Sequence, residues 1–173
     1  MTMTGTDEAV TSGLRLTSPR WTHVAIPTHD MDRSIEFWTE LTPLVLVARN
    51  KDDSGQSAWL SNPHNVTEPF VLVLVQLMPQ VAKQFDIEPG KPHRTVGPFA
   101  HFGVELPERG DVDAIADRAR EMGCLQWEPM QMPEHIGYIC AITDPDGNTI
   151  EFSHNQKVYE TIRKLWGGEA GAR

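Results

Sequence analysis

The chain has 173 residues, of which 39% are hydrophobic, and this suits one compact domain or two small repeats. Its formal net charge of −9 argues against nucleic acid or an anionic membrane as a partner, because both need clustered Lys and Arg. Two cysteines make no disulfide framework, and no stretch resembles a signal peptide or a membrane span. The sequence therefore predicts a cytoplasmic protein.

The first half of the chain predicts one strand, one helix and three further strands. Residues 1–19 are polar and predict a flexible leader, and a β-prone run follows at 21–27. Apolar residues at helical spacing then predict a helix that ends near residue 41, before Pro43. Strands are predicted at 44–48, 56–60 and 70–78, with a polar turn at 50–55.

The second half repeats this order after an irregular connecting loop at 79–98, which is long enough to be a lid or a binding loop. A strand is predicted at 100–106 and an amphipathic helix at 111–122, ending at Gly123. Further strands are predicted at 125–129, 136–143 and 149–154. Residues 156–173 form the last segment, in which 156–166 predict a terminal helix packing back on the fold.

The order β-α-β-β-β thus occurs twice, at 20–78 and at 99–155. Repetition on this scale indicates two copies of one supersecondary unit packed about a pseudo-twofold axis. The predicted fold class is α+β, with two βαβββ modules in tandem.

A histidine opens the first strand of each predicted module. His23 lies in Trp-Thr-His-Val-Ala-Ile and His101 in Phe-Ala-His-Phe-Gly-Val. Near the end of the second module, the turn Asp144–Asn148 leads into a strand that carries Glu151. Two histidines and one carboxylate on separate strands are the donors of a two-His-one-carboxylate metal site.

These three segments resemble the vicinal oxygen chelate superfamily, which includes glyoxalase I, methylmalonyl-CoA epimerase, extradiol dioxygenases and bleomycin-resistance proteins. The resemblance implies a curved mixed sheet, formed by the two modules around a cleft, with a divalent ion between them. It also implies His23, His101 and Glu151 as ligands and Gln76 as a fourth, a set most like that of the epimerase. The epimerase's second acid is missing, however, because Gly55–Ser61 contains no carboxylate.

The resemblance implies an enzyme that uses Ni, Co, Zn, Mn or Fe to polarise a carbonyl of a small substrate, so that a neighbouring proton is lost. Glu151 would take that proton, and His135 is the best candidate among the loop histidines for a further acid–base role. A lyase or isomerase of this kind is the favoured hypothesis. We also expect the protein to form a homodimer. Two alternatives stay open: an Fe(II)-dependent extradiol-type dioxygenase, and a metal-free protein that binds or sequesters a small molecule.

Overall fold

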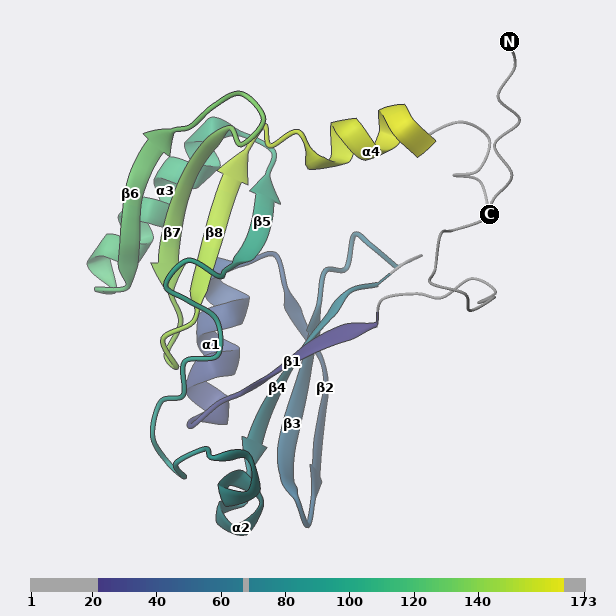
Figure 1. The fold of residues 1–173 in the computed structure, drawn as a ribbon, viewed down its shortest axis with the longest axis vertical. Coiled ribbons are helices and arrows are strands. Elements are labelled where there is room, and N and C mark those ends of the chain that lie inside the picture. Colours follow the sequence, from purple (N-terminus) through teal and green to yellow (C-terminus); the bar gives the residue numbers. More distant parts are fainter. Residues whose placement is uncertain (1–21, 67–68, 167–173) are drawn as a thin grey trace.

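The computed structural model describes residues 22–66 and 69–166. It has two four-stranded mixed sheets, one from each module, which confirms the α+β class and the tandem βαβββ order (Figure 1). In sheet A the strand order is β1-β4-β3-β2, and in sheet B it is β5-β8-β7-β6. The bounds in the first module are β1 His23–Pro27, α1 Met31–Leu41, β2 Val45–Asp52, β3 Gly55–Ser61 and β4 Val71–Leu77.

The second module follows a short helical stretch and repeats the same arrangement. In both modules the first and last strands pair in parallel, while the other pairs are antiparallel. The bounds are α2 Pro79–Ala82, the 3-10 helix η1 Lys83–Phe85, β5 Phe102–Leu106, α3 Arg109–Glu121, β6 Leu125–Gln131, β7 Tyr138–Thr143, β8 Thr149–His154 and α4 Val158–Trp166.

Two local expectations differ from the structure. The polar turn expected at 50–55 is shorter, because β2 continues to Asp52 and pairs with Gly55 at the start of β3. In addition, residues 79–85 of the expected irregular loop are helical, with Pro79 at the first position of α2, where its missing N–H costs nothing. The leader at 1–19 and Trp21 lie outside the described residues.

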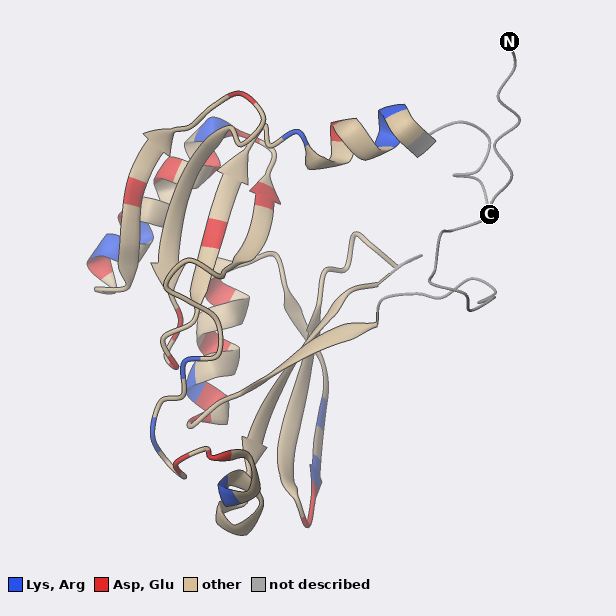
Figure 2. Ribbon diagram, in the orientation of Figure 1, with Lys and Arg blue, Asp and Glu red and all other residues tan. Residues whose placement is uncertain are grey.

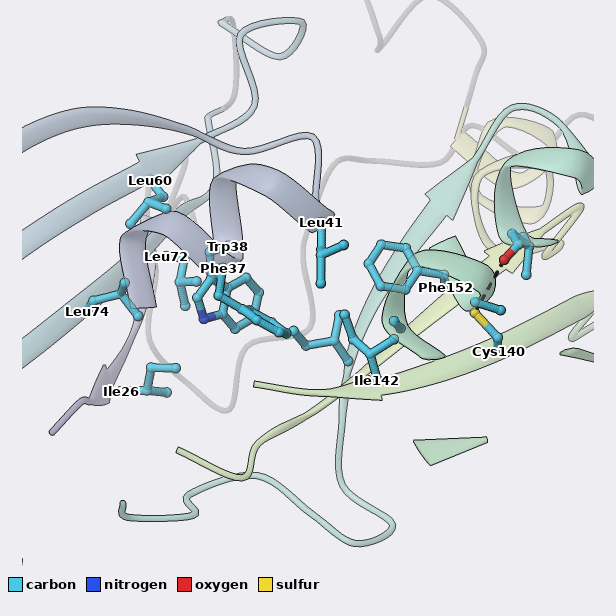
Figure 3. Close-up of a cluster of buried hydrophobic side chains, with 14 of the residues drawn as sticks. Ile26, Phe37, Trp38, Leu41, Leu60, Leu72, Leu74, Cys140, Ile142 and Phe152 are labelled. Carbon is cyan, nitrogen blue, oxygen red and sulfur yellow. Dashed lines mark hydrogen bonds between the residues drawn. The ribbon is translucent and has the colours of Figure 1, made fainter. Parts of the chain in front are cut away.

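Helix α1 lies between the two sheets and supplies the centre of the core (Figures 1 and 3). Phe37, Trp38 and Leu41 are buried among residues of both modules. The indole of Trp38 meets the ring of Phe102, from β5, edge to face with the ring centroids 5.6 Å apart. Because this pair joins α1 of the first module to β5 of the second, the two modules share one core. Edge-to-face aromatic pairs also stabilise a core beyond the burial of apolar area.

Buried polar groups also join the modules, at the turn before β8. Asp144 accepts hydrogen bonds from the backbone N–H groups of Asp146 and Asn148, which closes the turn. Asp146 then reaches across to the first module, where it accepts from the backbone N–H of His29 at 3.0 Å. Burial raises the pKa of Asp144, because a charged carboxylate is costly away from water.

The terminal helix α4 does not pack back as expected. The side chains of Val158, Tyr159, Ile162 and Leu165 are exposed, with fractions from 42% at Ile162 to 69% at Leu165. In Figure 1 the helix extends away from the sheets. The prediction rested on its apolar stripe, but a stripe shows only that a helix can bury one face, and not where. No helix within the described residues is long and apolar enough to cross a membrane.

Candidate metal centre

His101 and Glu151 lie together on the face of sheet B that points away from α3. The neighbours of Glu151 along β8, Ile150 and Phe152, belong to the core, so alternation turns the carboxylate to the opposite face. Residue 151 pairs with Gly103 of β5, two positions after His101. The histidine Nε2 lies 3.5 Å from Glu151 Oε2.

The ring of His101 is held in an orientation that suits a metal ligand. Its Nδ1 lies 2.6 Å from the carbonyl oxygen of Phe99. A proton on Nδ1 donated to that carbonyl leaves the lone pair of Nε2 available, and metal-binding histidines are commonly oriented in this way. The rings of Phe99 and Trp127 flank the imidazole, with centroids at 6.2 and 6.0 Å.

Glu151 is a buried carboxylate with weak partners. Its side chain is 7% exposed, and its hydrogen bond from Gln156 Nε2 is 3.3 Å long. A buried charge needs compensation, and neither a 3.5 Å contact with a histidine nor an amide at 3.3 Å supplies a full opposite charge. The site therefore offers two side chains that can bind a metal. A divalent cation bound there would supply the positive charge that the carboxylate of Glu151 lacks.

His23 occupies the equivalent position in the first module. It opens β1 as His101 precedes β5, and its side chain is exposed at the edge of sheet A. The residue in the place of Glu151 is Val73, since Val73 pairs with Ala25 as Glu151 pairs with Gly103. The first module thus offers one donor and the second module offers two.

The structure does not bring Gln76 to His23, so we leave it out of the metal site. His23 pairs with Val71, and Gln76 lies five residues further along β4, roughly 16 Å away at the rise of a strand. The amide is also occupied, because Gln76 Nε2 donates to His29 O at 2.7 Å and Oε1 accepts from Gln56 at 2.6 Å. The resemblance placed Gln76 by its position at the end of a strand, but register decides which residue faces the histidine.

His135 is likewise distant from the pair. It is exposed in the loop between β6 and β7, beyond the point where Tyr138 pairs with His154. Glu151 lies three residues before His154, roughly 10 Å along the strand. We therefore assign His135 no part in the site. Within the described residues, no three His, Cys, Asp or Glu side chains are close enough to hold an ion.

The residues that the sequence did not single out are those that hold the pair in place: Phe99, Trp127 and Gln156. Phe99 acts through its backbone carbonyl, which no side-chain pattern reveals. Trp127 and Gln156 come from β6 and from the segment after β8, and only folding brings them to His101 and Glu151.

Comparison with known proteins identifies the family of the chain. Residues 20–152 match the family model of the Glyoxalase/Bleomycin resistance protein/Dioxygenase superfamily. The chain belongs to this superfamily. An uncharacterized protein of Pseudomonas aeruginosa, PA2024, is 32% identical over 141 residues, which is 80% of this chain and 91% of that protein.

Solved structures with the same fold include both enzymes and binding proteins. The trypanothione-dependent glyoxalase I of Leishmania major has a TM-score of 0.57 at 19% identity, over 90% of this chain and all of that one. TnmS3, an antibiotic binding protein from Streptomyces sp. CB03234, has a TM-score of 0.55 at 20% identity, over 81% of this chain and 98% of that one. At these identities the likeness concerns the fold alone.

Proposed function

We propose that this superfamily member is a divalent-metal-dependent enzyme that removes a proton beside a carbonyl group of a small substrate, as a lyase or isomerase. The observation that carries the proposal is the pair of His101, with Nδ1 at a backbone carbonyl, and the buried Glu151. A divalent ion bound there would polarise the substrate carbonyl and acidify the neighbouring C–H bond.

The chain's own residues would supply the proton transfer. Glu151 is the base: one of its carboxylate oxygens accepts the proton from the carbon beside the carbonyl and later returns it to the adjacent carbon. Gln156 holds the other oxygen, Oε1, which restricts the rotation of the carboxylate. The half-buried ring of Trp127 lies beside His101 and covers one side of the imidazole, whereas Phe99 is largely exposed.

Metal content is the first test. The wild-type protein should carry Ni, Co, Zn or Mn at close to one ion per site by mass spectrometry, and His101→Ala should lose it. His135→Ala is the matched control, because His135 is an exposed histidine of the same module outside the site, and it should retain the metal. Iron in the wild type together with oxygen consumption would favour a dioxygenase. A wild-type protein that takes up no added metal would refute the metalloenzyme and favour a binding protein.

Proton abstraction has its own readout. A substrate carbonyl compound incubated with the enzyme in D2O should exchange the hydrogen next to its carbonyl, which NMR detects. Glu151→Gln keeps the shape of the side chain but removes the base, so exchange should fall by at least about a hundredfold. Exchange at the wild-type rate in Glu151→Gln would exclude Glu151 as the base.

We further propose that His23 of a second copy completes the site in a homodimer. His23 and His101 both lie at the start of an edge strand, β1 and β5, whose outer edges have no strand partner among the described residues. Open edges favour pairing with another chain, and a twofold axis would bring the β1 edge of one copy beside the β5 edge of its partner.

A mixing experiment tests the shared site. His23→Ala and His101→Ala should each bind no metal as homodimers. A mixed dimer has one site that keeps both histidines, so a 1:1 mixture refolded together should regain about a quarter of the wild-type metal. If the site forms within one chain, mixing restores nothing, while the metal content of the wild type is unchanged.

A further inference from the structure

A cavity lies at the far end of sheet A from His23. It measures about 330 Å³, which is within the size range of small-molecule sites. We call it the loop cavity, because the segment after α2 forms one of its walls. The ends of β1 and β4 and the start of β3 form the other walls, and its lining includes His29, Lys51, Gln76, Lys91 and His93.

His29 is fixed at this cavity by three contacts. Its Nδ1 lies 2.7 Å from Asp146 Oδ1, and its backbone N–H donates to the same oxygen at 3.0 Å. Its carbonyl accepts from Gln76 Nε2 at 2.7 Å. The carboxylate of Asp146 is only 1% exposed, so the imidazole is oriented by a buried anion.

This arrangement leaves one ring nitrogen of His29 for a ligand. With Nδ1 donating to Asp146, the other nitrogen, Nε2, presents a lone pair. Nε2 has no hydrogen-bond partner within the described part of the chain, and the side chain is 15% exposed. A histidine whose ring is locked by a buried carboxylate and opens on a cavity is preorganised to bind.

The charged side chains that line the loop cavity are mostly positive, although the protein as a whole is acidic. The lining carries Lys51 and Lys91, against Glu88, which is paired with Lys91. Among the described residues, Lys51 has no carboxylate partner. In Figure 2, blue segments on β2 and on the loop after α2 lie at this end of sheet A, together with red segments at the tip of the β2–β3 hairpin and on the same loop. The side chains that line the loop cavity therefore have a net charge of +1, which favours an anion even though the whole chain carries −9.

We propose that the loop cavity binds a small oxyanion that also carries an O–H group, the chemistry shared by hydrogenphosphate and 2-hydroxy acids. Lys51 attracts the anionic oxygens, and Nε2 of His29 accepts the hydrogen bond from the hydroxyl. The loop cavity is separate from His101 and Glu151, so this proposal does not depend on the metalloenzyme.

Calorimetric titration of the full chain tests it, with inorganic phosphate and glycolate as alternative ligands. Sulfate is the control ligand, because it resembles phosphate but carries no proton at neutral pH. Phosphate or glycolate should bind saturably and at least about tenfold more tightly than sulfate. The titrations are repeated in His101→Ala, so that an anion bound at the metal centre is not counted.

His29→Asn separates binding from packing. The asparagine amide can still donate to Asp146 from the place of Nδ1, while the group at Nε2 is lost. This variant should keep the wild-type melting temperature and weaken binding about tenfold or more. His64→Asn, at an exposed loop position, is the matched control and should bind as the wild type does. No saturable binding in the wild type, equal affinity for sulfate, or unchanged affinity in His29→Asn would overturn the proposal.

Discussion

The shared core predicts a large and specific stability loss at Trp38. This side chain is 2% exposed and contacts Phe102 of the other module, so Trp38→Ala would leave a cavity between the modules. Truncation of a buried Trp costs about 3–5 kcal/mol, of which the edge-to-face pair accounts for about 1 kcal/mol. For a domain of ordinary stability this is a large share of the free energy of unfolding.

Trp38→Phe separates packing from hydrogen bonding. The indole Nε1 is buried and has no hydrogen-bond partner among the described residues. An unsatisfied buried donor costs about 1–3 kcal/mol, and phenylalanine removes that cost while it keeps a ring against Phe102. The loss for Trp38→Phe should therefore be less than half of the loss for Trp38→Ala.

Urea unfolding followed by far-UV circular dichroism measures both variants, since this signal does not depend on the removed indole. Trp59→Ala is the control, because that indole is 45% exposed on sheet A and its loss should cost less than about 1 kcal/mol. A loss below about 1 kcal/mol for Trp38→Ala, or equal losses for the two Trp38 variants, would refute a core shared through this residue.

Three further predictions concern stability. Burial raises the pKa of the Cys140 thiol to about 12 from an ordinary value near 9. The thiol of the unfolded chain therefore ionises first, and the free energy of unfolding falls as the pH rises from about 9 toward 12. Urea unfolding should show a loss of about 1.4 kcal/mol between pH 8 and 10 that Cys140→Ala lacks. Gly137 has φ +88°, and a Cβ there would lie 2.2 Å from His154 O, so Gly137→Ala should cost at least about 1–3 kcal/mol, whereas Gly110→Ala in α3 meets nothing and should be neutral or stabilising. Ending the chain after Lys157 removes α4, whose apolar residues are exposed, so the free energy of unfolding should change by less than about 1 kcal/mol. A larger loss would show that α4 packs against the rest of the protein in solution.

Much of the fold was predictable because its signals are local. Apolar spacing predicts α1, and its observed start and end follow from the Asp30 cap and from the chain's extended path at Thr42. Strand alternation and the Asp144–Asn148 turn predict β8 within its observed bounds. The repeat of these patterns is itself a sequence property, and it predicts two modules.

The sequence by itself determined that His23 and His101 open equivalent strands of the two modules, and that His101 and Glu151 lie on different strands of the second module. Only the tertiary structure decided that they are 3.5 Å apart, that Val73 stands where a matching acid of the first module would be, and that Gln76 instead holds His29. The reason is physical: alternation and turns act over a few residues, whereas the register between β1 and β4, or between β5 and β8, depends on packing against α1 and α3. A one-residue change in register exchanges the two faces of a strand, and no local pattern records that choice.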